Sequence, residues 1–356
     1  MTTDISRRRI VQGIGAVAAG VTLPGFIGPA LAQAAALRVT HFGGPYKPLE
    51  GILTAPFETA TKGTLEWSVE TSVSALSKMQ AAPDSPPFDA ALMSRSFGMR
   101  AAKAGLLRTI EPAKITNLKE TIDGTLTPGG SGVAMFFDSV DLMVNTDIYK
   151  GQIKSWMDLW NPDLKGKLIM PSSAISTSLY VLICVVRAMG GKEENDKDID
   201  NAFRKLAELK PNVRTFFSDP IQPNQILERG EAGVAPQFVI RVFAASKVNP
   251  KVVRMSAKEG QVAIGYDWVI TKGAKNPDLA HRFIDTTLAA AQQAKAFEAQ
   301  YGTPVRRNLV RPGAAKAPGA SDSGKLFFID EDFVAEKQRG WLQRWSREVQ
   351  GGRKLP

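Results

Sequence analysis

The sequence is short of the residues that most often build metal and catalytic sites. Its 356 residues include one cysteine and two histidines. A single cysteine excludes a disulfide within the chain, and Cys184 lies in an apolar run, where the usual role is a small buried side chain. No Cys/His spacing typical of zinc occurs, so we expect neither a metal nor a cofactor. A Gly-x-Ser-x-Gly elbow and a P-loop are also lacking, so we expect no enzymatic activity.

The charge pattern argues against a nucleic-acid partner. Lys and Arg number 45 against 35 Asp and Glu, which gives a formal net charge of +10. The basic residues are scattered among acidic ones, however, and form no long block. Hydrophobic residues make up 44% of the chain, an ordinary proportion for a globular protein. A chain of this length suits two domains.

The first 34 residues have the order of an export signal. Basic residues at Ser6–Arg9 precede an apolar, small-residue stretch at Gly13–Ile27, and Ala32–Ala34 follows. The paired arginines resemble the twin-arginine signal, so we expect export to the periplasm and cleavage near Ala34. The alternative is a membrane anchor, which the short stretch and its Pro24 make less suitable.

Beyond the signal, apolar strand-like runs alternate with helical patterns. This alternation predicts an α/β protein. We expect a helix at the end of the chain, with Trp341, Leu342 and Trp345 on one face. The expected strands are Leu37–Phe42, Thr64–Val69, Phe88–Met93, Val133–Phe137, Leu142–Asn145, Lys167–Met170, Val213–Phe217, Val234–Phe238 and Val262–Ile270. The expected helices include Lys47–Thr59, Gly98–Ala104, Ser176–Met189, Ile199–Leu209, Pro223–Arg229 and Pro277–Leu288, and Lys192–Asp200 is expected to be a loop.

Four segments of the sequence, taken together, are specific enough to indicate a protein family. They are Phe42–Tyr46, Leu142–Leu168, Gln222–Ala232 and Asp267–Ile284. In this order and spacing they resemble the periplasmic solute-binding proteins of the spermidine/putrescine, ferric-iron and phosphonate type. The resemblance runs from about Leu37 to Asn308, most of the chain after the signal.

The resemblance implies two Rossmann-like α/β lobes joined by crossing hinge strands, the type II periplasmic binding protein architecture. On this pattern lobe one is 35–143 plus 268–330, lobe two is 144–267, and residues 331–356 form a C-terminal helix packed on the lobes. The crossings are expected near Met143–Asn145 and Ile264–Val269. Such a protein is a monomeric receptor that closes around a small molecule and delivers it to the membrane permease of an ABC importer.

The residues expected to contact the solute lie at strand ends and helix starts, where backbone donors point outward. They are Gly44, Tyr46, Ser94, Arg95, Ser96, Ser173, Ser176, Thr177, Gln237, Phe238, Asp267, Trp268 and Tyr301. Each also has a purely structural interpretation: Ser176 and Thr177 as helix caps, and Trp268 as part of the core.

Two classes of solute remain open. A guanidinium at Arg95 and hydroxyls at Ser176 suit a carboxylate or phosphonate, and Asp267 suits an amino group at the other end. This pattern favours a small anionic or zwitterionic solute, such as an amino or organic acid or a phosphonate.

The alternative solute is a polyamine. The polyamine-binding relatives hold ammonium groups with carboxylates, yet the matching stretch Pro171–Ser178 contains no acid. Asp267, Trp268 and Tyr46 would then be the centre of the site. Ferric iron is less suitable, because Tyr301 has no neighbouring tyrosine.

Overall fold

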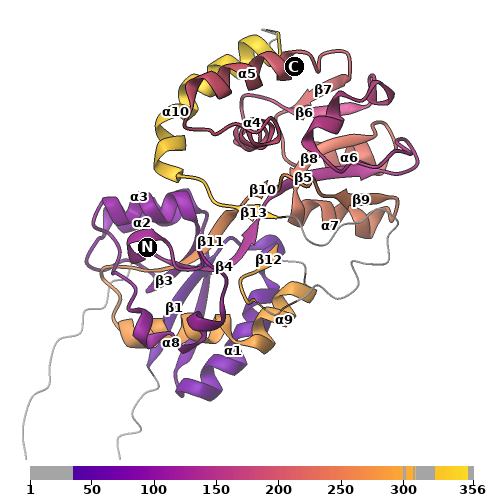
Figure 1. Cartoon of the computed structure of the whole chain (residues 1–356). Helices are drawn as coiled ribbons and strands as arrows, with labels where there is room; N and C mark the ends of the chain where they lie inside the picture. Colours follow the sequence, from indigo (N-terminus) through magenta and orange to yellow (C-terminus); the bar gives the residue numbers. More distant parts are fainter. Residues whose placement is uncertain (1–34, 300–301, 308, 310–324, 352–356) are drawn as a thin grey trace, which may run out of the picture. The chain divides into compact units, whose positions relative to one another are not determined.

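The computed structural model describes residues 35–299, 302–307, 309 and 325–351. The expected export signal and Tyr301 lie outside these ranges. The described residues build two large β-sheets and a separate two-stranded sheet, and Figure 1 shows each large sheet with its own set of helices.

The first sheet has six strands in the order β12-β4-β11-β3-β1-β2. β1 pairs in parallel with β2 and β3, whereas β11 runs antiparallel to β3 and β4. The apolar residues of β1, β3 and β4 are buried because helices cover the sheet. The strands are β1 (Ala36–His41), β2 (Thr64–Val69), β3 (Ala90–Ser94), β4 (Val133–Asp138), β11 (Ile264–Ile270) and β12 (Thr303–Pro304). The helices are α1 (Pro48–Thr61), α2 (Ser72–Ala81), α3 (Arg95–Lys103), α8 (Pro277–Leu288) and α9 (Ala290–Glu298).

The second sheet has five strands in the order β7-β6-β8-β5-β9. Its core includes most of helix α4, whose apolar residues are buried on nearly every side. The strands are β5 (Val140–Asn145), β6 (Leu168–Pro171), β7 (Val213–Phe217), β8 (Val234–Phe238) and β9 (Val252–Met255). The helices are α4 (Thr177–Ala188), α5 (Asp196–Ala207), α6 (Gln222–Glu228) and α7 (Val239–Val248). Two large sheets with helices on them form the mixed α/β architecture that the sequence predicted.

The chain passes from the first sheet to the second within a single residue. Asp138 ends β4 in the first sheet, and Val140 begins β5 in the second, so Ser139 is the point of transfer. The run Met143–Asn145, where the sequence placed this crossing, instead pairs wholly within the second sheet. The chain returns from β9 through β10 (Gln261–Val262) into β11.

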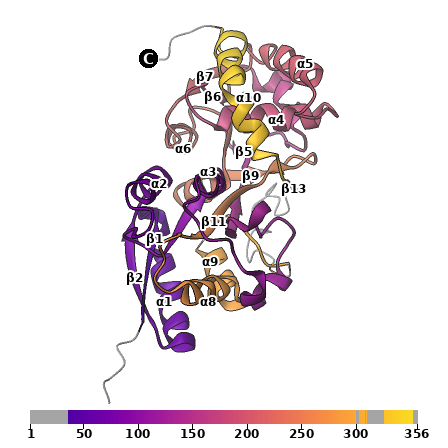
Figure 2. The ribbon, with the colours of Figure 1, turned by 90° about the vertical axis from the view of Figure 1, so that its left-hand side faces the viewer.

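The last described segment contacts first the connection between the two large sheets and then the helices of the second sheet. Strand β13 (Leu326–Phe327) pairs with β10, and α10 (Glu331–Arg344) then runs beside α4, as Figure 2 shows. Trp341 and Trp345 are buried in the core of the second sheet, while Leu342 is partly buried. No helix within the described ranges combines the length and the apolar character that crossing a bilayer requires.

Four elements differ from the sequence prediction. Helix α7 and strand β9 were not expected, because the β-branched residues of Val239–Val248 favour a strand and only packing makes them helical. Helix α3 begins at Arg95, three residues before the expected Gly98. Helix α5 begins at Asp196, within the stretch expected to be a loop, because Asn195 caps it.

Candidate functional site

An aromatic cluster follows the end of β1. Gly43 has φ 69°, and a Cβ there would lie 2.6 Å from Val69 Cγ1, so the turn requires glycine. The exposed Gly44 (φ 49°) continues the turn and brings Tyr46 back towards the sheet. The Tyr46 ring lies 6.1 Å from that of Tyr266 on β11. The other members are Phe42, 5.0 Å from Tyr46, and Phe136, 4.9 Å from Tyr266.

Tyr266 links this cluster to helix α7. Burial raises the pKa of its phenol well above the usual range, and neighbouring Tyr46 and Asp138 add to the rise. The positive charge of Arg241 acts in the opposite direction. Arg241 therefore lies near enough to Tyr266 for its guanidinium to influence the phenol.

Arg241 is a guanidinium that the fold leaves unpaired. It stands in the first turn of α7, and only its backbone carbonyl is engaged, by the side chain of Asn224 at 2.8 Å. Over the described residues its side chain has neither a hydrogen bond nor an acidic partner. A partly buried and unpaired guanidinium next to tyrosines can bind a carboxylate or phosphate group.

Asp138 holds the start of α7 in place. Its Oδ1 accepts hydrogen bonds from the backbone N–H groups of Ser139 (2.9 Å) and Ile240 (3.4 Å). Burial raises the pKa of this carboxyl to about 6, and the backbone donors act against the rise. Asp138 thus has a structural task, because it fixes the turn that presents Arg241.

Gln237 and Phe238, two of the expected contact residues, have different positions. The Gln237 side chain is fully buried and donates to the carbonyl of Pro220 (2.8 Å) and to Oδ1 of Asn224 (2.9 Å). These bonds tie β8 to α6 and make Gln237 a structural residue. Phe238 is partly exposed, and its ring lies 6.4 Å from that of Tyr180.

The start of α4 presents a mixture of exposed and buried hydroxyls. Ser176 caps the helix and is exposed, whereas Thr177 is 2% exposed and faces the core. Ser173 is partly exposed, and its N–H donates to Oε1 of Gln350 at 2.8 Å. One turn into α4, burial raises the pKa of the Tyr180 phenol well above the usual range, and Glu331 adds to the rise.

Arg95 and Asp267 are bound to each other. The guanidinium donates from Nε to Oδ2 (2.9 Å) and from Nη2 to Oδ1 (3.0 Å), and Arg95 is 6% exposed. Thr127 donates to the same carboxylate, and Nη2 also donates to the carbonyl of Gly124. The sequence assigned Arg95 and Asp267 to opposite ends of a solute. The fold instead neutralises each with the other, because β11 lies next to β3, which leads directly into Arg95.

The serines on either side of Arg95 differ in their contacts. Ser94 caps α3 without a side-chain cap bond, and its N–H donates to the hydroxyl of Ser72 at 3.1 Å. Ser96 is partly exposed. Neither serine supplies a group to the Arg95–Asp267 pair.

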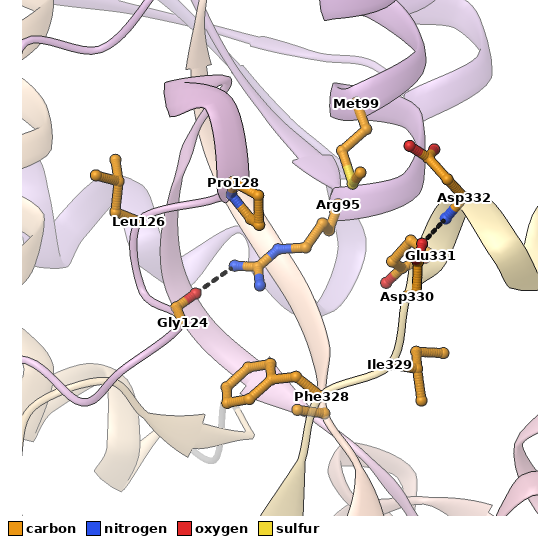
Figure 3. Close-up of a pocket in the computed structure, with 11 residues that line it drawn as sticks. Arg95, Met99, Gly124, Leu126, Pro128, Phe328, Ile329, Asp330, Glu331 and Asp332 are labelled. Carbon is orange, nitrogen blue, oxygen red and sulfur yellow. Dashed lines mark hydrogen bonds between the residues drawn. The ribbon is translucent and has the colours of Figure 1, made fainter. Parts of the chain in front are cut away.

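A cavity of about 600 Å³ opens beside Arg95. Figure 3 shows Arg95 and Met99 on one side and the segment Phe328–Asp332 on the other. Glu331, in this segment, has neither a hydrogen bond nor an ion-pair partner within the described parts of the chain. Burial raises the pKa of the Glu331 carboxyl to about 7, although the nearby charge of Arg95 acts against the rise.

Trp268 belongs to the core and not to an exposed site. It is fully buried, its ring centroid lies 4.9 Å from that of Phe283, and its indole N–H has no partner among the described residues. Tyr301 lies outside the described residues. The structure thus groups Tyr46, Ser176 and Phe238 with the aromatic and charged residues above, and it gives Arg95, Asp267, Gln237, Thr177 and Trp268 internal roles.

Four residues near the candidate site were missed from the sequence: Tyr180, Tyr266, Arg241 and Glu331. Tyr266 directly precedes Asp267, so attention to the opposite face of the same strand would have found it. Arg241 follows an expected strand by three residues, but the helix that carries it was not anticipated. Glu331 had no sequence signal, because only the return of the chain end brings it near Arg95.

The chain matches the family model described as bacterial extracellular solute-binding protein over residues 53–321. It belongs to this family. It is a solute-binding receptor of the ABC-importer class and not an enzyme, in agreement with the sequence prediction.

Two curated relatives illustrate the similarity. An uncharacterized protein of Haemophilus influenzae is 29% identical over 317 residues, which cover 82% of this chain and 87% of the relative. The spermidine/putrescine-binding periplasmic protein 1 of the same organism is 28% identical over 230 residues, or 62% of each chain.

Solved structures share the fold at low identity. A putative extracellular solute-binding protein from Bordetella parapertussis has a TM-score of 0.78 at 21% identity, covering 88% of this chain and 98% of that one. The spermidine/putrescine-binding protein PotD of Streptococcus pneumoniae has a TM-score of 0.72 at 16% identity, covering 87% and 98%. The Atu4243-GABA receptor has a TM-score of 0.68 at 21% identity, covering 88% and 97%.

Proposed function

We propose that this receptor binds a small anionic or zwitterionic solute, with amino acids and organic acids as the first candidates. The observation that carries the proposal is the unpaired guanidinium of Arg241 beside Tyr266. A carboxylate or phosphonate that reached Arg241 would gain two charge-assisted hydrogen bonds in a partly desolvated place.

Glu331 supports the zwitterionic form of the proposal. Its carboxyl influences Tyr180, and Tyr266 also influences Tyr180, so one set of tyrosines lies near both charged groups. An ammonium group near Glu331 would favour the ionised carboxylate and offset the cost of its burial. A solute with one carboxylate and one amino group complements the charges of Arg241 and Glu331.

The polyamine alternative requires two available carboxylates. Asp267 is already neutralised by Arg95, and Asp138 accepts backbone N–H groups at the start of α7. Among Asp267, Asp138 and Glu331 of the described residues, the carboxyl of Glu331 is the one left near Tyr180. A second ammonium would therefore lie near Arg241, where two positive charges repel each other.

The names of relatives and structural neighbours are compatible with either class of solute. Curated relatives are named for spermidine and putrescine, whereas two neighbours of the same fold are described with GABA and with fructose-6-phosphate. GABA carries one ammonium and one carboxylate, which is the charge pattern proposed here.

The cellular setting follows from the family and from the signal. We propose that the twin-arginine segment directs export to the periplasm, that cleavage occurs near Ala34, and that the mature protein is a monomer. By lobe closure it would then deliver the solute to a membrane permease. The lobe boundaries of this proposal lie where the chain changes sheet, at Ser139 and between β10 and β11, and not at 143/144 and 267/268.

A thermal-shift screen of the purified full chain tests the solute class. The compounds are α-amino acids, 4-aminobutanoate, dicarboxylic acids, phosphonates, putrescine and spermidine. A solute that binds only the folded state adds about 2.7 kcal/mol of stability at 100 times its Kd. Stabilisation by a carboxylate or phosphonate is the expected result. Stabilisation by putrescine or spermidine alone would overturn the proposal.

A further inference from the structure

The end of the described chain contacts the loop that leads into α4. The side-chain Oε1 of Gln350 accepts a hydrogen bond from the backbone N–H of Ser173 at 2.8 Å. The indole N–H of Trp345 donates to the carbonyl of Pro171 at 2.9 Å. Both side chains are buried, with exposures of 5% and 1%. Two hydrogen bonds thus hold one short loop, and in each of them the two partners lie more than 170 positions apart in the sequence.

A widened helical turn makes this double contact possible. Residues Trp345–Val349 form a π-helical turn, closed by the N–H of Gln350 donating to the carbonyl of Trp345 at 3.0 Å. In an α-helix, residues five apart point about 140° away from each other. The wider π turn reduces this angle, so Trp345 and Gln350 reach the same loop.

The loop itself has few other internal restraints. The hydroxyl of Ser172 accepts from the N–H of Ala174 at 3.2 Å, and the N–H of Ile175 reaches the carbonyl of Ser172 only at 3.4 Å. Ser176, which begins α4, has no side-chain cap bond. The Ser172 N–H also donates to the carbonyl of Phe217 at 2.8 Å, and the Ser178 hydroxyl donates to the carbonyl of Ile175 at 2.8 Å. Trp345 and Gln350 add to these bonds by holding the Pro171 carbonyl and the Ser173 N–H between them.

The α4 start is part of the candidate solute site. Ser176 is exposed there, one turn before Tyr180, whose phenol lies near Tyr266 and Glu331. The backbone N–H groups at the start of a helix favour a negatively charged group. A displaced loop would move these donors away from an anionic solute.

We infer that Gln350 and Trp345 are positioning residues that fix the Pro171–Ser176 loop and, through it, the solute-binding start of α4. The second part of this inference rests on the proposed function, whereas the first part does not. Gln350 and Trp345 contact no solute themselves. They act by satisfying backbone groups of the loop.

The test uses matched variants of the full chain. Gln350→Met keeps the length of the side chain but removes the strong acceptor, and Gln350→Glu keeps an oxygen acceptor. Trp345→Phe keeps an aromatic ring without the N–H donor. Gln343→Met is the control, because Gln343 is exposed on the same segment.

Amide hydrogen exchange of the segment 171–180 is the primary measurement. We expect exchange at Ser173 to accelerate roughly three- to tenfold in Gln350→Met and in Trp345→Phe. Gln350→Glu and Gln343→Met should exchange at the wild-type rate. If acceleration were absent in Gln350→Met, or were uniform over the whole chain, the positioning role would be refuted.

Binding of 4-aminobutanoate, measured by calorimetry, tests the link to the site. We expect roughly three- to tenfold weaker binding in Gln350→Met, with near wild-type binding restored in Gln350→Glu. Accelerated exchange with unchanged affinity would overturn the link between the loop and the site. If the wild type did not bind 4-aminobutanoate, that result would count against the proposed solute, while the exchange data would still decide the positioning role.

Discussion

Arg95 and Asp267 lie 172 positions apart in the sequence and neutralise each other through two charge-assisted hydrogen bonds of 2.9 and 3.0 Å. Both side chains are almost fully buried. The pair joins the start of α3 to the middle of β11, so it fixes a helix against the sheet that carries Tyr266. Its disruption should therefore affect stability first.

We predict that Asp267→Asn lowers the free energy of unfolding by about 3–5 kcal/mol, because it leaves the Arg95 guanidinium buried and unpaired. Urea denaturation measures the loss. The double variant Arg95→Met/Asp267→Leu should regain at least part of it, since no uncompensated charge remains. Asp147→Asn, which breaks an exposed pair with Lys150, is the control and should change stability by no more than about 0.5 kcal/mol. Equal losses in Asp267→Asn and Asp147→Asn would contradict the prediction.

Gly265 leaves the space that Arg95 fills. A Cβ at this position would lie 2.6 Å from Arg95 Nε and 2.8 Å from Asp267 Oδ1. Gly265→Ala should therefore displace the guanidinium and cost about 1–3 kcal/mol of stability, measured by thermal unfolding.

Gly51→Ala is the matched control for Gly265→Ala. Gly51 lies exposed inside α1 with open space around it, so alanine there should stabilise the protein by about 0.5–1 kcal/mol. A neutral effect of Gly265→Ala would show that Arg95 can be accommodated elsewhere.

Arg241→Ala should weaken binding of a carboxylate-bearing solute by about tenfold or more, because a charge-assisted hydrogen bond contributes about 1.5–3 kcal/mol. Calorimetric titration with the carboxylate that is most stabilising in the thermal screen measures the change. Arg214→Ala, at an exposed position on β7, should leave the affinity unchanged. A wild-type affinity in Arg241→Ala would remove Arg241 from the site.

Glu331 should make stability depend on pH. Its pKa in the folded protein is about 7, above the ordinary value of 4.5. Below pH 4.5 the carboxyl is protonated in both states, so its burial costs little. As the pH rises towards 7, the unfolded state loses its proton first, and stability falls until both states are ionised.

Glu331→Gln removes this cost. The variant should match the wild type near pH 4.5 and be more stable at pH 8 by on the order of 1–2 kcal/mol, after allowance for the partial exposure of Glu331. Chemical denaturation at a series of pH values measures the difference. Glu336→Gln, at an exposed position of α10, should follow the wild-type curve throughout. A constant difference across the series would assign the effect to packing.

The sequence was most informative where local pattern and global fold agree. The apolar run of β1 and the proline at the start of α8 were recognisable because each is decided by nearby residues. Helix α7 was not, since Val239–Val248 becomes helical only through its packing and the Asp138 contact. Arg241 was missed along with its helix.

The site residues, too, could be predicted only where nearby residues determine their position. Arg95 and Asp267 were recognised as important charges, but their mutual pairing depends on strand neighbours far apart in the sequence. Tyr46 follows the Gly43–Gly44 turn, which is visible locally, and the fold brings its ring to 6.1 Å from that of Tyr266. Glu331 depends on the return of the chain end, which no local pattern encodes.

The position of α10 and the π turn determines when the second sheet can fold during translation. Trp341, Trp345 and Val349 belong to the same buried core as β5 and α4, although more than about 150 residues of chain separate them from either element. A nascent chain that has been translated only as far as α9 exposes this apolar surface to solvent. The second sheet therefore completes its core only after residue 349 has been synthesised. Early termination of translation would leave an aggregation-prone, protease-sensitive intermediate.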